Sequence, residues 1–339
     1  MARHGVVCGG SWCVDRNYVI DRWPEEETLA EILAEELQGG GSGTNMSVDL
    51  KKLGAPFPVE AIGLVGDDSD GRFLIDLCDR MGVDRTQLHV SAEIPTSVTE
   101  VMSVRATGKR TFFYRAGAHD VLGPDHFDFG RTNAALLHLG LPGVHKTLDA
   151  PFEGDPSGWV TVLRRARAAG LKTNIELVSI APERIAAIGR PLLAHLDLVV
   201  VNDVEAGAVA GIATIVDGKT DADACAEAAN AILERGIAEL VVVHFPFGAV
   251  AATRAGAVVK KPSVRVPPEA IAGTNGAGDA FAAGIVLGVH EGWPLDRSLA
   301  LAHASAAASL RSVTTNGAVE DWRKCLRLAG EWGWREEFR

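Results

Sequence analysis

Short apolar runs and longer helical stretches alternate along most of this 339-residue chain. The apolar runs are rich in valine, isoleucine and leucine, and they occupy residues 5–9, 59–66, 134–140, 196–202 and 240–245. Between most of them lie stretches with helical periodicity, at residues 69–81, 158–169, 182–196 and 222–235. Strands that alternate with helices of this length indicate βαβ units, in which helices cover both faces of a parallel sheet. The pattern therefore predicts an α/β fold, a three-layer αβα sandwich with a central, mainly parallel sheet.

Two segments do not follow this alternation. Residues 18–23 and 96–118 interleave β-branched and aromatic residues with polar ones, which is typical of half-exposed strands. The first segment follows the first core strand directly and the second follows another core unit. We expect both to form a small β-sheet lid, with strands from about 12–38 and 96–118, that covers one end of the main sheet. The chain, 1–339, is then a single domain with the lid strands inserted in it.

The composition restricts the partners and the compartment. The formal net charge is −11, so phosphate backbones and anionic membrane surfaces are repelled on average, which argues against nucleic-acid and membrane binding. The five cysteines are scattered without a Cys-x-x-Cys pair, and we find no signal-peptide or membrane-span pattern. We therefore expect a cytoplasmic protein that holds anionic ligands with local dipoles and a few placed cations.

The segment AGTNGAGDAF, at residues 272–281, is the first candidate for chemistry. Gly276, Ala277 and Gly278 stand where an irregular stretch enters a helix that is apolar on nearly every side. Free backbone N–H groups and the helix dipole make such an entry an anion site, and the dipole also stabilises the carboxylate of Asp279 in the first turn. The alternative is a simple turn followed by a helix-end charge. The chain has no Walker or Gly-x-Gly-x-x-Gly motif, which argues against P-loop and Rossmann folds.

Four motifs in a fixed order connect this segment with the rest of the chain. They are GGSGTN at 40–45, LGAPFPVEAIGLVGDDSDG at 53–71, VNDVEAG at 201–207 and GTNGAGDAFAAG at 273–284. In this order and spacing they closely resemble the ribokinase-like family of carbohydrate kinases, also called PfkB kinases, from Gly9 to about Ala318. The resemblance implies a ribokinase-like fold and an enzyme that uses ATP and Mg²⁺ to phosphorylate a primary hydroxyl of a sugar or sugar acid.

The resemblance assigns roles at the centre of phosphoryl transfer. Asp279 matches the family's catalytic base, which takes the proton from the attacking hydroxyl. Gly276, Ala277 and Gly278 match the anion hole over the transferred phosphate. Phosphoryl transfer depends on positioning and charge stabilisation, so a fixed carboxylate beside backbone donors is the minimum machinery expected.

The metal and nucleotide positions follow from the same comparison of motifs. Asn202 and Glu205 match the Asn-x-x-Glu motif, which positions Mg²⁺ and phosphate through water, and Mg²⁺ prefers oxygen ligands. For Asn202 a helix N-cap is the alternative, and the two roles can coexist. Asn202, Thr274, Gly248 and His303 match positions near the nucleotide.

Five residues match the acceptor side of the family's site. Asp15 matches an acidic residue that binds sugar hydroxyls, and Asn45 with Gly40 and Gly41 matches a glycine-rich sugar cradle. The alternative is that the polar members only cap loops. Arg115, in a lid strand, is a candidate to bind a sugar carboxylate, although about half of the residues in such a strand point to solvent.

Two departures from the family pattern concern the nucleotide and ion sites. Gly273 stands where relatives that bind a monovalent cation have an aspartate ligand. Because glycine offers only its carbonyl oxygen, this departure argues against activation by potassium. The stretch HFPFG, residues 244–248, replaces a Thr-Leu-Gly stretch near the nucleotide phosphates, and His244 either acts as a donor there or fills a strand end.

The sequence leaves the acceptor open. A nucleoside kinase would use the same mechanism with a different acceptor pocket, and a non-catalytic sugar or nucleotide sensor would retain the fold without the chemistry. The lid strands often pair between subunits in this family, so a homodimer is a candidate assembly.

Overall fold

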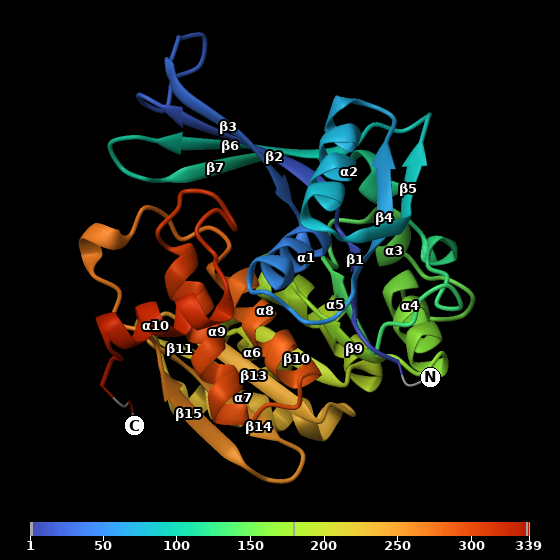
Figure 1. Cartoon of the computed structure of the whole chain (residues 1–339), viewed down its shortest axis with the longest axis vertical. Coiled ribbons are helices and arrows are strands. Elements are labelled where there is room, and N and C mark those ends of the chain that lie inside the picture. The colour runs from blue at the N-terminus through green and yellow to red at the C-terminus, as the bar shows by residue number, and fades with distance from the viewer. Residues whose placement is uncertain (1–2, 179, 337, 339) are drawn as a thin grey trace.

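The computed structural model describes residues 3–178, 180–336 and 338, and within them one large sheet lies between two layers of helices (Figure 1). In spatial order its nine strands in this part of the chain are β15 (Val258–Pro262), β14 (Gly248–Thr253), β13 (Leu240–Phe245), β10 (Leu198–Asn202), β9 (Lys172–Ile175), β8 (Leu136–Gly140), β1 (Val6–Gly10), β4 (Val59–Gly66) and β5 (Asp84–Ser91). The strands from β13 to β5 are parallel, and β14 and β15 continue the sheet antiparallel. The predicted fold class is confirmed.

The strands are buried on both faces because successive side chains point in opposite directions. On β1, Val6 and Cys8 belong to one core cluster and Val7 to the other. One layer of helices contains α1 (Ser42–Lys52), α2 (Ser69–Met81), α8 (Ala277–His290), α9 (Leu295–Ser309) and α10 (Trp322–Trp332). The other contains α4 (Gly158–Ala168), α5 (Pro182–Leu192), α6 (Asp203–Ala210) and α7 (Ala222–Arg235).

The remaining elements are short. They are the helix α3 (Lys146–Asp149), the 3₁₀ turns η1 (Gly117–Asp120), η2 (Pro124–His126), η3 (Leu193–His195) and η4 (Pro268–Ala270), and the hairpin β11 (Ile215–Val216) and β12 (Lys219–Thr220). The predicted helices at 69–81 and 222–235 are confirmed to the residue. The predicted helix at 182–196 divides into α5 and η3, because Pro191 removes a hydrogen-bond donor near the end of α5.

A second, four-stranded sheet projects from one end of the main sheet, at the upper left of Figure 1. In spatial order it contains β3 (Ile32–Gly40), β2 (Cys13–Ile20), β6 (Ser97–Val104) and β7 (Arg110–Arg115). The pairs β2–β3 and β6–β7 are antiparallel, and β2–β6 is parallel. Strands β6 and β7 lie in the segment 96–118 and β2 overlaps the segment 18–23, whereas β3 lies outside both segments with the half-exposed pattern. We call it the small sheet.

Side-chain contacts attach the small sheet to the main body. Arg16 forms an ion pair with Asp70 at 2.7 Å, and Arg115 lies 3.6 Å from the other carboxylate oxygen of Asp70. The hydroxyl of Tyr114 donates to the carbonyl oxygen of Val144 at 3.2 Å. The small sheet is therefore held at the first turn of α2 and at the loop that follows β8.

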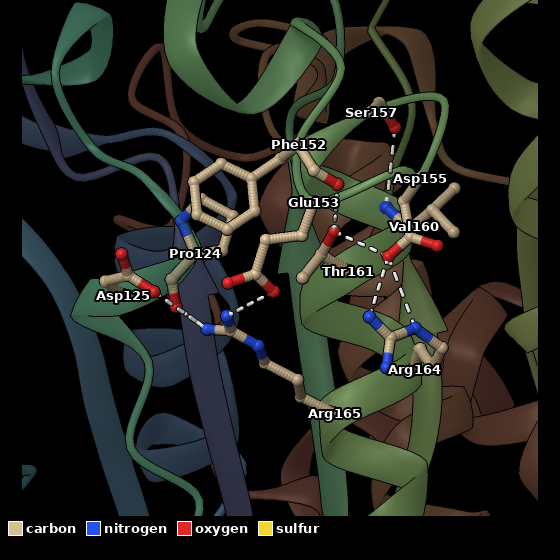
Figure 2. A network of polar contacts seen from close by, with 10 residues as sticks. All are labelled: Pro124, Asp125, Phe152, Glu153, Asp155, Ser157, Val160, Thr161, Arg164 and Arg165. Carbon is tan, nitrogen blue, oxygen red and sulfur yellow. Dashed lines mark hydrogen bonds and ion pairs between the residues drawn. The ribbon is translucent and has the colours of Figure 1, made fainter.

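A separate polar network fastens the loops around the start of α4 (Figure 2). Arg165 contacts Asp125 and Glu153, each at 3.0 Å, and Thr161 donates to Asp155 at 2.7 Å. The two ion pairs of Arg165 lie at the surface, so each contributes at most about 1 kcal/mol to stability. Together they fix the loop after α3 and the turn at η2 on the same helix.

Two further observations concern cysteines and hydropathy. All five cysteines are buried and free of disulfide bonds in the described part of the chain. Among the helices of the described residues, none combines the length and the apolar character that crossing a bilayer requires.

Candidate active site

Two cavities lie side by side where the parallel strands end. The first, of about 530 Å³, lies between the small sheet and the ends of β9 and β10, and its lining includes Asp15, Tyr114, Glu176 and Asp279. The second, of about 490 Å³, is lined mainly by apolar side chains from α8, α9 and the segment after β15. Asn202, His244 and Gly278 line both cavities. The carboxyl ends of parallel strands are where ligands bind in open α/β sheets.

The start of α8 forms part of the wall between the cavities. Gly276 is its N-cap residue with a φ of 74°, and a Cβ there would lie 2.1 Å from the carbonyl oxygen of Thr315. Only glycine fits this position without displacing the backbone. Ala277 lines the second cavity and Gly278 lines both, so the start of α8, whose first backbone N–H groups have no partner within the helix, lies beside both cavities.

Asp279 lies in the first turn of α8 among other acidic groups. Burial is the main cause that raises its pKa well above the usual range, and the neighbouring Glu176 raises it further. Burial likewise raises the pKa of Glu176 to about 7, with Glu205 and Asp49 adding to the effect. A carboxylate with a raised pKa is a stronger base, because its proton is held more tightly than that of an exposed aspartate.

His138 supports Glu176 from the neighbouring strand β8. Its Nε2 lies 3.3 Å from the carboxylate of Glu176, and its Nδ1 lies 2.9 Å from the side-chain amide of Asn174. Burial lowers the pKa of His138 to about 4, so the ring is neutral near pH 7. With the amide donating to Nδ1, the ring proton resides on Nε2 and faces the carboxylate.

Four of the five predicted acceptor residues, all except Arg115, lie at the first cavity or directly beside the residues that line it. Asp15 and Gly41 line it, and Gly41 is the N-cap of α1. A Cβ at Gly40 would lie 2.3 Å from the carboxylate of Asp15, so this close approach requires glycine. Asn45, buried in α1, interacts with Asp279 and lowers its pKa, against the larger effect of burial. The structure thus brings these predicted residues to the same place as Asp279.

Asn202 and Glu205 form a reciprocal cap at the start of α6. The side-chain oxygen of Asn202 accepts from the backbone N–H of Glu205 at 2.9 Å, and Glu205 Oε2 accepts from the N–H of Asn202 at 3.0 Å. The N-cap alternative for Asn202 is therefore correct. Burial raises the pKa of Glu205 to about 7. Both residues still line the first cavity, so their capping role does not remove them from the site.

The predicted nucleotide residues divide between two places. Thr274 and His303 line the second cavity, where burial lowers the pKa of His303 to about 3 and keeps its ring neutral. Gly248 is not among the described lining residues of either cavity. It lies in β14, where a Cβ would be 2.1 Å from the ring of Phe338. The structure therefore does not place Gly248 at the cavity, and it explains the glycine by packing instead.

Arg115 also lies elsewhere than the sequence predicts. On β7 the cavity is lined by Phe112 and Tyr114, and the alternation of side chains turns Arg115 to the opposite face of the small sheet. There it pairs with Asp70. In place of Arg115, the hydroxyl of Tyr114 reaches the cavity and lies 2.6 Å from Nδ1 of His119.

Several residues at the first cavity were not predicted from the sequence. Tyr114, His119 and Glu176 line it, and His138 lies beside Glu176. The segment 114–119, His138 and Glu176 meet only through the sheet topology. A signal existed for Glu176, because it directly follows a buried strand, at the edge of a parallel sheet where functional groups gather.

Comparison with known proteins identifies the family. The pfkB family carbohydrate kinase pattern matches residues 3–322 of the chain. The chain belongs to the PfkB family of carbohydrate kinases. It is accordingly an enzyme, a sugar kinase that transfers a phosphoryl group to an alcohol.

The relatives and solved structures cover nearly the whole PfkB chain. It is 26% identical to the 5-dehydro-2-deoxygluconokinase of Shouchella clausii over 96% of this chain and 95% of the relative. It is 27% identical to the 1-phosphofructokinase of Rhodobacter capsulatus over 85% and 84% of the two chains. The solved structure of Arabidopsis thaliana ribokinase with ribose and ATP superposes with a TM-score of 0.77 at 22% identity, over 97% of this chain and 99% of the other. This last likeness supports the ribokinase-like fold.

Proposed function

We propose that this PfkB kinase transfers the γ-phosphoryl group of ATP to a primary hydroxyl of a sugar or sugar acid, with Asp279 as the general base. The observation that carries the proposal is the position of Asp279 and Gly278. Asp279 lines the first cavity, and Gly278 lines both. An acceptor in the first cavity and a nucleotide in the second would therefore meet at the start of α8.

The chemical step follows from this arrangement. Asp279 accepts the proton of the acceptor hydroxyl while the hydroxyl oxygen forms a bond to the γ-phosphorus. The bond from that phosphorus to the β–γ bridging oxygen breaks, and ADP leaves. Backbone N–H groups of Gly276, Ala277 and Gly278 would stabilise the charge on the transferring group, because they point from a helix N-terminus.

The residues at the start of α6 fit a magnesium ion. The buried carboxylate of Glu205 has a raised pKa, which shows that no cationic side chain compensates it strongly. The described residues contain no cluster of three or more histidine, cysteine or acidic ligands. This agrees with Mg²⁺, which is usually bound by one or two carboxylates together with phosphate and water. Glu205 and Asn202 would hold it, and its chemistry there is to neutralise charge on the phosphates.

The two cavities suit the two substrates. The second cavity offers apolar walls from Phe281, Ala306 and Leu310 for a base, with Thr274 and His303 at its polar positions. The first cavity offers Asp15 and other carboxylates that can accept from hydroxyls. In a nucleoside kinase the first cavity would also have to hold the nucleobase of the acceptor. A non-catalytic sensor would not need Asp279.

The remaining proposals concern the whole chain. We propose a single kinase domain in which the small sheet acts as a lid over the first cavity. The buried free cysteines support a reducing, cytoplasmic location. A Cβ built at Gly273 would lie 2.9 Å from the carbonyl oxygen of Ser312, so an acidic side chain does not fit here without displacing the backbone, and we propose that potassium is not required.

The test of the proposed function is ADP release from Mg-ATP with a panel of sugars, sugar acids, sugar phosphates and nucleosides. We expect one class of acceptor to stimulate turnover. Asp279→Asn is expected to lower kcat about 100-fold to 10,000-fold with little change in nucleotide binding, because it removes the base and keeps the shape. The exposed Asp217→Asn serves as the matched control. Full turnover by Asp279→Asn would show that another group is the base.

A further inference from the structure

The charges that line the first cavity have one sign. Four carboxylates line it, those of Asp15, Glu176, Glu205 and Asp279. Among the described residues that line it there is no lysine and no arginine. With Glu205 assigned to the metal, three carboxylates remain to face the acceptor.

The histidines of this cavity do not supply positive charge. Burial lowers the pKa of His119 to about 3 and that of His244 to about 4. His119 accepts from the backbone N–H of Trp12 through Nε2 at 3.0 Å, so its proton is on Nδ1 and faces the hydroxyl of Tyr114. Both rings are neutral near pH 7 and can only form neutral hydrogen bonds with a ligand.

The arginines of the small sheet are directed away from the acceptor. Arg16 and Arg115 both lie against Asp70 on the opposite face of the sheet. Arg110 is on the same side of β7 as Phe112 and Tyr114, but its guanidinium lies 3.4 Å from the hydroxyl oxygen of Thr274. Thr274 lines the second cavity. This arginine of the small sheet is thus directed toward the cavity proposed for the nucleotide.

We propose that the acceptor of this kinase is an uncharged polyhydroxyl compound, without a carboxylate or phosphate group, and that Glu176 is a residue that excludes anionic acceptors. This inference rests on the proposed function and narrows it. Hydroxyl groups can donate to several carboxylates at once, whereas an acceptor carboxylate or phosphate would meet acidic groups without a compensating cation. Two of the relatives are named as kinases of a sugar acid and of a sugar phosphate. Under this inference the acceptor of this chain differs from theirs in charge.

The position of Glu176 explains why its charge would affect which acceptors bind. It follows β9, and its side chain is 25% exposed toward the cavity. Nε2 of His138 lies 3.3 Å from its carboxylate, and the other ring nitrogen of His138 contacts Asn174. The neighbouring histidine is neutral, and the described residues of the cavity lining include no arginine or lysine that could neutralise the carboxylate for an anionic ligand.

The experiment compares matched acceptors that differ in charge and retain a free primary hydroxyl. The pairs are ribose and ribonate, glucose and gluconate, and fructose and fructose 6-phosphate, each measured as kcat/KM for ADP release and as binding by calorimetry. For the pair that contains the best acceptor, we expect the uncharged member to be preferred on the order of 100-fold. Glu176→Gln is expected to reduce this preference about tenfold or more. Glu227→Gln, the same change at an exposed position of α7, is expected to leave it unchanged.

The outcomes distinguish the two proposals. An anionic member that is used as well as its uncharged partner, or better, overturns the inference and leaves the kinase assignment intact. If no member of any pair is bound or used, and no other acceptor stimulates ADP release, the proposed function fails and the inference fails with it. An unchanged preference in a folded Glu176→Gln protein overturns the role of Glu176. The wild-type comparison requires no variant, so it tests the acceptor class even if Glu176→Gln does not fold.

Discussion

Glu176 lies in a cavity lined by three other carboxylates, and burial raises its pKa to about 7. A carboxyl group with a folded pKa above its unfolded value stabilises the fold fully only below the unfolded pKa. The contribution is lost as pH rises from about 4.5 through 7, because the folded protein then has to carry the buried charge. The negative charge of Glu176 therefore lowers the stability of the folded protein, and the site keeps it for its chemistry.

This cost predicts a pH-dependent effect of Glu176→Gln on stability. At pH 8 the variant is expected to be more stable than the wild type by about 2 kcal/mol, because glutamine removes the buried charge. At pH 5 the difference is expected to be small, since Glu176 is then protonated in the folded protein. Urea unfolding at both pH values measures it, with Glu227→Gln as the control. Equal effects at pH 5 and pH 8 would contradict the raised pKa.

The residues of the site were predictable where they belong to a local motif. Asp279 and Gly276 are read from one helix entry, and Asn202 with Glu205 from one reciprocal cap. Glu176 and His138 were not, because their neighbours come from other strands. Arg115 was predicted to face the acceptor because of its residue type. Which side chains of β7 face the cavity depends on the register of that strand, and the register places the neighbouring Tyr114 there instead.

At the scale of elements, some of the polar contacts between the small sheet and the main body lie at the cavities. Tyr114 contacts His119 and the carbonyl of Val144, and Arg110 contacts Thr274. These contacts lie at the two cavities themselves. Ligands that fill the cavities would add contacts to the same strands, and a lid of this kind excludes water from the transferring phosphoryl group.

We therefore predict that ligands slow hydrogen exchange in the segment 96–118. The expected result is slower amide exchange in β6 and β7 when acceptor and a non-hydrolysable ATP analogue are both bound, because closure stabilises these strands. Exchange in β15, at the far edge of the main sheet, serves as the internal control. Identical exchange of 96–118 with and without both ligands would argue against a lid.

The elements themselves were predictable to different degrees. The helices α2 and α7 have strong periodicity and clear caps, with Asp68 and Asp221 accepting from the first turns, and their bounds were predicted exactly by the sequence pattern. Strand β3 was not singled out, because its polar positions 35, 36 and 38 interrupt any apolar run. Its pairing with β2, rather than its own hydrophobicity, makes it a strand.

For the whole molecule, the outer face of the small sheet supports a homodimer. The register places Leu37 beside Arg16, Arg16 beside Glu100 and Glu100 beside Phe113, in one row on the face away from the cavity. Leu37 and Phe113 are 42% and 51% exposed, and Trp23 stacks on Phe113 at 6.2 Å. Exposed apolar side chains at both ends of the row, with the Arg16–Glu100 pair between them, make this face a candidate surface for a second chain.

If the outer face of the small sheet is the dimer interface, charged substitutions on it should prevent dimer formation. We expect the wild-type protein to be a dimer by light scattering after gel filtration. The double variant Leu37→Lys and Phe113→Lys is expected to be a monomer, because lysine side chains resist burial at an interface. Val258→Lys, at an exposed position of β15, is the control and is expected to remain dimeric. A monomeric wild type at micromolar concentration would rule out the assembly.

The shared wall between the two cavities has a consequence for inhibitor design. Asn202, His244 and Gly278 are common to both linings, so the two cavities adjoin at these residues. One molecule that joins an adenosine group to a polyol through a short phosphate chain could occupy both spaces at once. Its second half would bind at the high effective concentration set by the link, so its affinity would exceed that of either half alone.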